Sequence, residues 1–419
     1  MNILFLSTND SRGGAASVTL RLMEALRRQG VEARMLTARK DTTLPYVRRV
    51  SPLRRMAAKI AERIQILLAG APFGKSMWKL STASFGADPL SDPWVREADV
   101  IVLGWTNQGL LSLRGIERLV QSGKPVLWWM HDYWCATGIC HLPGSCWRFA
   151  DGDCGECPFL GAKAAGNDLS RRIHSLKHRL YASSGGRLRF YAVSEFQRSL
   201  IKESTLAQAM GEVKVLPHAF PAQLYRISPA TDRYRHAQER QLIVCGAASL
   251  DDPMKNIRGA VRALNLLARK HPESADSCHV IFFGDTKDTS VFHDLAIPAT
   301  LAGTLDETRL RELYASAAVV LSSSLSETMG ATLMEGLASG AVAVSYDCGG
   351  PRDLISHGSN GFLVPVGEEE QLAEAIASAL RMELLQGKEG RLRRHREIAG
   401  RFDAQAVART LLSEIDAMR

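Results

Sequence analysis

No apolar run in the 419 residues reaches the roughly 20 residues needed to cross a bilayer. Low-complexity tracts are also absent, and a content of 46% hydrophobic and 23% charged residues is ordinary for a globular chain. The first eight residues lack a basic segment, and their apolar stretch is too short for a signal peptide. These features exclude disordered, collagen-like and coiled-coil chains, and we expect a cytoplasmic protein of two or three domains.

Negative charge is scarce in the first half of the chain. Residues 1–215 hold 30 Lys and Arg against 18 Asp and Glu, a net charge of +12, whereas the remainder is −4 within a total of +8. A basic half fits an anionic partner, such as nucleic acid or an anionic membrane surface. A solvated basic surface without a partner is the simpler alternative.

Cysteine is sparse except in one segment, which holds five of the eight cysteines, from Cys135 to Cys157. In a chain without a secretion signal, such clustering favours a metal site over disulfides. A closed tetrahedral zinc site would take its thiolates from Cys140, Cys146, Cys154 and Cys157, with Cys135 and His141 as alternative ligands. Only one pair is spaced Cys-x-x-Cys, so reduced thiols, a redox pair and a catalytic metal stay open.

Short apolar runs alternate with amphipathic stretches, which predicts βαβ units and parallel sheets. In the first half we expect strands at 2–8, 31–37, 98–103, 126–130 and 188–193, and helices at 15–29, 109–122 and 195–209. In the second half we expect strands at 242–247, 280–283, 319–322 and 342–346, helices at 255–270, 306–316, 328–339 and 367–381, and a helical tail at 389–418.

This alternation predicts an α/β protein of two doubly wound, Rossmann-like domains facing a central cleft, because ligands of such sheets bind at the carboxyl ends of the strands. We expect an N-terminal domain over 1–217 with a Cys-rich insertion at 135–158, and a Pro-rich, polar linker over 218–240. A C-terminal domain over 241–400 follows, and a helix over 401–419 is expected to pack back toward the N-terminal domain.

Two glutamates, Glu327 and Glu335, flank the expected start of a helix. Free backbone N–H groups and the helix dipole at such a start favour an anion or a cluster of sugar hydroxyls. A carboxylate is also a good acceptor for vicinal hydroxyls. On spacing alone, a first-turn Glu followed by an ordinary helix Glu is the simpler interpretation.

The surrounding motifs change that interpretation. Ser323, Glu327-x7-Glu335-Gly-Leu-Ala-Ser-Gly-Ala-Val-Ala-Val-Ser, Gly349-Gly-Pro351 and Gly358-Ser-Asn-Gly-Phe-Leu-Val-Pro365 occur in the order of the donor-binding half of retaining glycosyltransferase family 4. Residues 241–381 therefore resemble that family, whose fold is GT-B. The stretch from His131-Asp-Tyr-Trp-Cys-Ala-Thr-Gly to Cys154-Gly-Glu-Cys-Pro158 resembles its colanic acid and exopolysaccharide branch. The resemblance implies a hexosyltransferase of polysaccharide biosynthesis.

The resemblance also implies a role for each matching residue in the second half. Glu327 would contact the donor sugar, with Gly330 and Ala331 as backbone donors beside it, and Glu335 would bind the ribose hydroxyls. Lys255 would neutralise the diphosphate. The family has an arginine a few residues before that lysine, which is missing from the stretch Gly246-Ala-Ala-Ser-Leu250, so Arg258 or another basic group would substitute.

In the first half, Gly13 and Gly14 match a glycine loop that lets the backbone approach phosphate or acceptor. His131 matches a histidine near the donor sugar and, with Glu327, is a candidate catalytic residue. The family's hinge motif Asn-Gly-x-Asp reads His218-Ala-Phe-Pro221 here. The resemblance implies no cofactor for catalysis, since the nucleotide sugar is a substrate.

A basic amphipathic stretch, Arg54 to Leu68, separates apolar from cationic side chains on a helix, which suits docking on anionic lipid. A second basic cluster would add to it: Arg171, Arg172, Lys177, His178, Arg179, Arg187 and Arg189. A core-packed helix with a solvated basic face is the alternative. The resemblance implies an oligosaccharide or lipid-linked acceptor, for which peripheral attachment to the inner membrane face would be useful.

Two other function classes stay open. A nucleotide-sugar epimerase or hydrolase would share the donor site. A zinc-containing nucleic-acid-binding protein would use the basic half, but the cysteines lack finger spacing and no RNP or helix-turn-helix pattern occurs, so we expect no nucleic acid partner. Residues 69–76 fit a loose P-loop pattern, but no strand precedes them as a P-loop requires.

Overall fold

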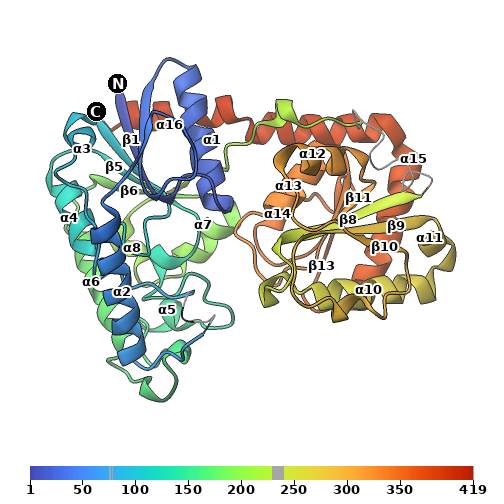
Figure 1. The fold of residues 1–419 in the computed structure, drawn as a ribbon, viewed down its shortest axis with the longest axis horizontal. Coiled ribbons are helices and arrows are strands. Elements are labelled where there is room, and N and C mark those ends of the chain that lie inside the picture. The colour runs from blue at the N-terminus through green and yellow to red at the C-terminus, as the bar shows by residue number, and fades with distance from the viewer. Residues whose placement is uncertain (75–76, 78, 229–239, 419) are drawn as a thin grey trace. The chain divides into compact units, whose positions relative to one another are not determined.

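The computed structural model describes residues 1–74, 77, 79–228 and 240–418. Contacts divide the chain into two compact units, one formed by Met1–Ala219 with Ala404–Arg419 and the other by Phe220–Asp403 (Figure 1). The second unit thus begins inside the expected linker 218–240, of which residues 229–239 lie outside the described part. Each unit is built on its own parallel sheet.

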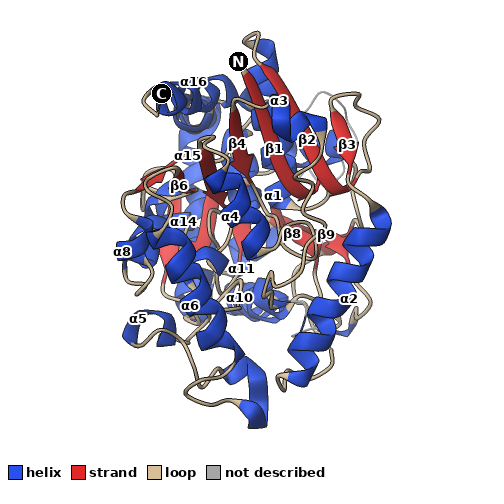
Figure 2. Ribbon diagram, turned by 90° about the vertical axis from the view of Figure 1, so that its left-hand side faces the viewer, coloured by secondary structure: helices blue, strands red, loops and turns tan. Residues whose placement is uncertain are grey.

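The first unit has a seven-stranded sheet in the order β3-β2-β1-β4-β5-β6-β7, every pair of which is parallel. The strands are β1 (Asn2–Asn9), β2 (Glu32–Arg39), β3 (Val47–Arg49), β4 (Val100–Leu103), β5 (Val126–Met130), β6 (Leu188–Ala192) and β7 (Val213–Val215). Figure 2 shows β1, β2 and β3 side by side. The strand order reverses between β1 and β4, which is where open α/β sheets bind ligands.

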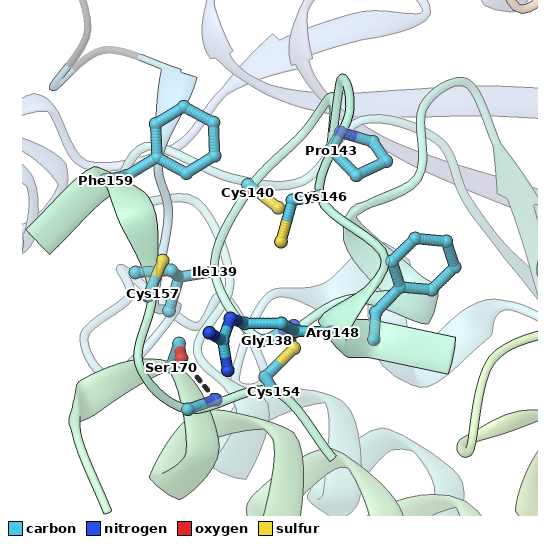
Figure 3. Close-up of a pocket in the computed structure, with 12 residues that line it drawn as sticks. Gly138, Ile139, Cys140, Pro143, Cys146, Arg148, Cys154, Cys157, Phe159 and Ser170 are labelled. Carbon is cyan, nitrogen blue, oxygen red and sulfur yellow. Dashed lines mark hydrogen bonds between the residues drawn. The ribbon is translucent and has the colours of Figure 1, made fainter. Parts of the chain in front are cut away.

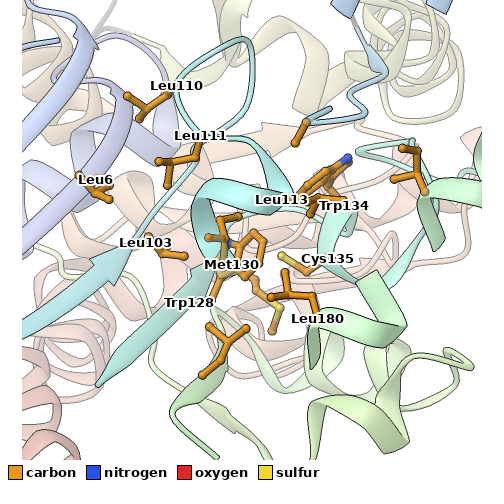
Figure 4. Close-up of a cluster of buried hydrophobic side chains, with 14 of the residues drawn as sticks. Leu6, Leu103, Leu110, Leu111, Leu113, Trp128, Met130, Trp134, Cys135 and Leu180 are labelled. Carbon is orange, nitrogen blue, oxygen red and sulfur yellow. The ribbon is translucent and has the colours of Figure 1, made fainter. Parts of the chain in front are cut away.

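Several helices of this unit contact the sheet directly, among them α1 (Gly14–Arg28) and α7 (Glu195–Lys202). In chain order, the helices in the described part of this unit are α1 (Gly14–Arg28), α2 (Pro52–Leu68), α3 (Pro93–Glu97), α4 (Leu113–Gln121), α5 (Arg148–Asp151), α6 (Leu169–Ala182), α7 (Glu195–Lys202), α8 (Ala207–Met210) and α16 (Ala404–Asp416). The last of these, α16, packs on α1, where Gln29 donates a hydrogen bond to the carbonyl of Gln405. In the core, Trp128 stacks on Phe190, and Figure 4 shows Trp128 with Leu103 and Met130 in one buried cluster.

The second unit has a six-stranded parallel sheet in the order β10-β9-β8-β11-β12-β13. Its strands are β8 (Gln241–Ser249), β9 (Cys278–Asp285), β10 (Ala299–Leu301), β11 (Val319–Ser322), β12 (Val342–Tyr346) and β13 (Gly361–Val364). Its helices are α10 (Ile257–Lys270), α11 (Pro272–Asp276), α12 (Glu307–Ser316), α13 (Ala331–Ala338), α14 (Pro351–Leu354) and α15 (Glu369–Phe402). Here the strand order reverses between β8 and β11.

The predicted α/β class with two Rossmann-like sheets is confirmed, because both sheets have the strand order that defines that fold. Strands 126–130, 319–322 and 342–346 have the predicted bounds. The predicted helix 195–209 is instead two helices, α7 and α8, separated by a turn at 203–206. The predicted 367–381 helix runs on to Phe402 with a kink at Gly387, and four short strands, β3, β7, β10 and β13, were not predicted.

Among the described residues, no helix is both long enough and apolar enough to cross a bilayer.

Candidate functional site

In the first unit, a pocket opens at the carboxyl edge of the sheet, beside the point where the strand order reverses. Its lining comes from the ends of β1, β4 and β5 and from the start of α1: Ser7, Asn9, Arg12, Gly13, Gly14, Ala15, Ala16, Trp105, His131 and Asp132. The fold therefore brings together three residues that the sequence predicted as site residues, Gly13, Gly14 and His131.

The start of α1 faces this pocket. Gly13 precedes the helix with a φ of +92°, a conformation that favours glycine, and no side chain caps the helix. The first N–H groups of a helix have no partner within it, and Ala15 and Ala16 of this first turn line the pocket. The geometry therefore offers backbone donors and the positive end of a helix dipole to a ligand.

His131 directly follows β5 and is held by α1. Its Nε2 lies 3.3 Å from the Thr19 hydroxyl, and that hydroxyl donates its proton to the Ala15 carbonyl at 2.7 Å. The imidazole therefore carries its proton on Nε2, which donates to Thr19. Burial lowers the pKa of His131 to about 4 despite the nearby Asp132, so the ring is neutral at pH 7.

Asp132 anchors a hydrogen-bond network that sequence reasoning missed. Its Oδ2 accepts from Trp105 Nε1 at 2.7 Å and from His141 Nδ1 at 2.6 Å, and its Oδ1 accepts from the Trp134 backbone at 2.9 Å. Burial opposes ionisation of Asp132, but these partners, His141 first, lower its pKa below the ordinary value. His141 Nε2 also lies 2.9 Å from Ser81 Oγ, so both ring nitrogens of this histidine have hydrogen-bond partners.

In the second unit, Lys255 and Glu327 meet at the carboxyl edge of the sheet, next to its own reversal of strand order. Lys255 Nζ lies 2.5 Å from Glu327 Oε1, and both side chains are partly exposed. Lys255 ends a short turn after β8, and Glu327 follows β11. The turn is tied to the loop after β11, because Ser323 Oγ donates to the carbonyls of Lys255 and Asn256 at 2.9 Å each.

The backbone of Glu327 is fixed by the turn after β12. Its N–H donates to the Cys348 carbonyl at 3.2 Å, and its carbonyl accepts from Gly350 N–H at 2.9 Å. A Cβ on Gly350 would lie 2.4 Å from backbone atoms of Thr328 and Met329, so only glycine permits this close approach. Gly350 therefore helps to fix the backbone from which the Glu327 side chain extends.

Helix α13 begins directly beside this pair. Gly330 precedes it with a φ of +97° and without a side-chain cap, so the N–H groups of its first turn are available. Ala331 is exposed at the helix start, and Glu335 lies half-buried one turn further on. Burial, with the nearby Glu335 carboxylate, raises the pKa of Tyr314 well above its ordinary value.

Arg258, the expected substitute for the missing arginine, is directed elsewhere. Its Nη2 lies 3.4 Å from Asp288 Oδ2, and both side chains are more than half exposed. The ion pair of Lys255 and Glu327 does not involve Arg258. In this structure Arg258 therefore contacts Asp288 rather than the Lys255–Glu327 pair.

The four predicted zinc ligands Cys140, Cys146, Cys154 and Cys157 line one separate pocket of the first unit (Figure 3). All eight cysteines are free thiols. Within the described ranges, no three or more His, Cys, Asp or Glu side chains already stand at the spacing of a metal site. The alternative ligands lie elsewhere, since Cys135 belongs to the hydrophobic core (Figure 4) and His141 to the Asp132 network.

One member of the expected basic cluster is not on the surface. Lys177 is fully buried, and its ammonium donates to the carbonyls of Trp134, Thr137 and Gly138 at 2.5, 2.9 and 2.8 Å. It cannot contact a lipid surface, so that part of the expectation is wrong. Within the P-loop-like stretch 69–76, residues 75 and 76 lie outside the described part.

Comparison with known proteins adds to this geometry. Residues 232–398 match the family glycosyl transferases group 1. A GDP-mannose-dependent alpha-mannosyltransferase of Mycobacterium tuberculosis is 35% identical over 105 residues, which span 25% of this chain and 28% of that protein. An exopolysaccharide phosphotransferase of Streptomyces coelicolor is 28% identical over 217 residues, 49% of this chain and 21% of that protein. The aligned regions thus span about a quarter of these curated relatives.

The solved structures agree on the fold. HepE of Anabaena, in complex with UDP and glucose, superposes over 100% of both chains with a TM-score of 0.62 and 17% sequence identity. The two Rossmann-like sheets of this chain are the architecture of a GT-B protein. Residues 232–398 therefore match the glycosyl transferases group 1 family, and the chain as a whole has the GT-B fold.

Proposed function

We propose that the chain is a retaining glycosyltransferase that transfers a sugar from a nucleotide-sugar donor to a lipid-linked oligosaccharide in polysaccharide biosynthesis. The observation that carries this proposal is the contact of Lys255 with Glu327 beside the start of α13. A cation, a carboxylate and free N–H groups at one sheet edge are the groups that a sugar diphosphate needs. The family match and the UDP-bound HepE structure support a nucleotide-sugar donor.

The Lys255–Glu327 pair suggests how the donor binds. A diphosphate carries more negative charge than one carboxylate, so it replaces Glu327 as the partner of Lys255. The carboxylate of Glu327 is then free to accept hydrogen bonds from the donor sugar, with the N–H groups at Gly330 and Ala331 beside it. Glu335, one turn further along the helix, accepts from the ribose hydroxyls.

Transfer then requires positioning and charge stabilisation rather than a protein nucleophile. The bond between the anomeric carbon and the phosphate oxygen breaks, and the acceptor oxygen bonds to that carbon on the same face. The leaving phosphate oxygen takes the acceptor's proton. Lys255 and the start of α13 stabilise the negative charge that develops on the diphosphate.

In the first unit, we assign His131 a role as a neutral polar group that contacts bound substrate. Its ring is neutral at pH 7, and its orientation is fixed by Thr19. The glycine loop Gly13-Gly14 and the start of α1 contribute backbone donors for phosphate or acceptor. No residue in this pocket needs a metal or cofactor for these tasks.

A membrane surface is the second partner that we propose, and α2 is the element that contacts it. Five apolar side chains at helical spacing are about half or more exposed: Leu53, Met56, Ile60, Ile64 and Leu68. Arg54, Arg55 and Lys59 lie on the same helix, so apolar insertion is paired with attraction to anionic lipid. Such docking would bring the protein to a lipid-linked acceptor on the inner membrane face.

The test is transfer itself, with a panel of UDP-, GDP- and ADP-hexoses and a lipid-linked oligosaccharide fraction. We expect one donor to yield an elongated lipid-linked product whose new linkage has the anomeric configuration of the donor sugar, as read by NMR. Release of free sugar without elongation would instead identify a hydrolase. Conversion of the nucleotide sugar without an acceptor would identify an epimerase, and an inverted linkage would contradict the retaining mechanism.

A further inference from the structure

The segment from His131 to Asp168 has little regular structure of its own. It contains two 3-10 turns, Trp134–Ala136 and Pro158–Lys163, and the four-residue helix α5. Long irregular segments inside a compact unit need a local constraint to hold one conformation. Four cysteines of this segment surround one pocket, whereas the other four cysteines of the chain are buried outside it.

We propose that Cys140, Cys146, Cys154 and Cys157 bind one zinc ion that holds this segment in shape, a function separate from sugar transfer. Zinc in structural sites is tetrahedral, accepts four thiolates as a complete ligand set and requires no open position. The pocket lining contains no His, Asp or Glu beside the four thiols, so the donor set is soft and closed. The sulfur atoms come from three stretches of the loop, and one ion would therefore tie all three together.

The surroundings supply hydrogen bonds to sulfur. The Gly138 N–H donates to Cys154 Sγ at 3.2 Å. Backbone N–H groups that donate to ligating sulfur are the outer contacts that orient thiolates and stabilise their charge. Ser170 Oγ accepts from the Gly155 N–H at 3.0 Å, which fixes the turn between Cys154 and Cys157 (Figure 3).

A buried cation lies next to this loop. Four thiolates around a divalent ion carry a net charge of about −2, which is costly to bury without a nearby positive charge. The ammonium of Lys177 is fully buried and donates to the carbonyl of Gly138, the same residue whose N–H reaches Cys154. The three hydrogen-bond partners of the Lys177 ammonium are carbonyls, and a zinc–thiolate centre would compensate its charge.

The backbone around the last two cysteines is strained. Four consecutive residues have positive φ: Asp153 (+52°), Cys154 (+61°), Gly155 (+88°) and Glu156 (+42°). Three of them carry side chains that disfavour this conformation, which persists only where the surroundings impose it. Ligation of Cys154 and Cys157 to one ion would impose that turn.

Binding must draw the four sulfurs inward to about 2.3 Å from the ion, since no three such groups in the described ranges stand at metal-site spacing. This gives the proposal a direct test on the full-length wild-type protein. We expect elemental analysis, after purification without a metal-affinity step, to find about one zinc per chain and no stoichiometric iron. Exchange with Co²⁺ should produce the visible absorption of a tetrahedral tetrathiolate centre.

Variants assign the ligands. We expect Cys146→Ser and Cys157→Ser to lose most of the zinc, whereas Cys135→Ala, from the same segment but outside the pocket, retains it. If the serine variants do not fold, thiol counting on the wild type replaces them: native chelation should make four additional thiols reactive. Zinc far below one per chain with no cobalt spectrum would overturn the proposal, as would iron with sulfide, or disulfides among these four cysteines in the native protein.

Discussion

Lys255 Nζ lies 2.5 Å from Glu327 Oε1, although 72 residues separate the two in the chain. Ser323 and Gly350 bring them together, the first through hydrogen bonds to the Lys255 turn and the second through a close backbone approach. The pair lies at the carboxyl edge of the sheet, where both partners are partly exposed. It is therefore accessible to a ligand, and a diphosphate would separate the two charges.

The first prediction concerns Glu327→Gln. The amide is similar in size but no longer holds the lysine through charge, so nucleoside diphosphate binding should be retained or slightly strengthened. Sugar transfer should fall by roughly 100-fold, because contacts that matter in the transition state are lost. Initial transfer rates and nucleotide affinity, measured on the same preparation, check this split. Equal loss of both would show that Glu327 acts only in binding.

The second prediction concerns Glu335→Ala, which removes a charged hydrogen-bond acceptor from α13. Nucleotide binding should weaken by about 1–3 kcal/mol. The ribose is the proposed partner, so a 2′,3′-dideoxy nucleoside diphosphate should bind the wild type more weakly than the parent nucleotide does. In the Glu335→Ala variant that difference should disappear. Its persistence in the variant would exclude Glu335 as the ribose ligand.

The third prediction is a pH dependence of stability in the first unit. Burial lowers the pKa of His131 to about 4 in the folded protein, against about 6.5 in an unfolded chain. As the pH falls from 6.5 toward 4, the unfolded chain binds a proton that the folded one does not, so stability is lost on acidification. At pH 5 this histidine alone should cost roughly 2 kcal/mol.

Chemical denaturation at pH 7 and pH 5 measures this loss. All seven tryptophans lie between residues 78 and 147, so their fluorescence reports on the first unit alone. The variant His131→Phe keeps a ring against Trp129 but cannot be protonated, and it should lose less stability than the wild type on acidification. His174, whose pKa burial also lowers to about 4, leaves part of the loss in the variant. Identical losses in both proteins would contradict the assignment.

The fourth prediction concerns the exposed stripe of α2. We expect the wild type to sediment with anionic phospholipid vesicles and far less with neutral phosphatidylcholine vesicles. The double variant Ile60→Gln/Ile64→Gln should bind at least about 10-fold more weakly, because two apolar side chains no longer insert. The pair Leu384→Gln/Leu385→Gln is the matched control, since those leucines are even more exposed but lie on α15 of the second unit. Equal losses in both double variants would remove α2 as the docking element.

The sequence predicted the central strands of both sheets and missed their edges. The four strands that were not predicted, β3, β7, β10 and β13, are the four edge strands of the two sheets. Each has three or four residues, and β10 is exposed throughout. A central strand is buried on both faces and gives a continuous apolar run, whereas a short edge strand gives no such pattern.

The candidate sites of the two units differed in how far sequence could describe them. The grouping of residues in the second unit was predictable in outline because Glu327, Gly330 and Glu335 follow one another within a single loop and helix. The Asp132 network was not, since Trp105, His141 and Ser81 meet only through folding, up to 60 residues apart. Its one available signal was that Trp105 and Asp132 each follow a strand at the carboxyl edge.

The run of basic residues predicted a surface position for Lys177, which is buried. Lys177 stands in a run of basic residues, but on α6 it points inward and finds three carbonyls. The composition of this amphipathic helix does not reveal which of its cations is buried, because the carbonyls that bind Lys177 come from the distant loop 134–138.

The measurement that tests the central claim most directly is calorimetric titration of the purified protein with UDP, GDP and ADP. We expect one of the three to bind, and Lys255→Ala to weaken that binding by about 10- to 100-fold, the loss of charged hydrogen bonds to phosphate. Lys270→Ala is the matched control, since that lysine pairs with Glu370 on the surface. This variant should bind the nucleotide as the wild type does. Binding of none of the three, or equal affinity in wild type and Lys255→Ala, would contradict a nucleotide-sugar site at this edge of the second sheet.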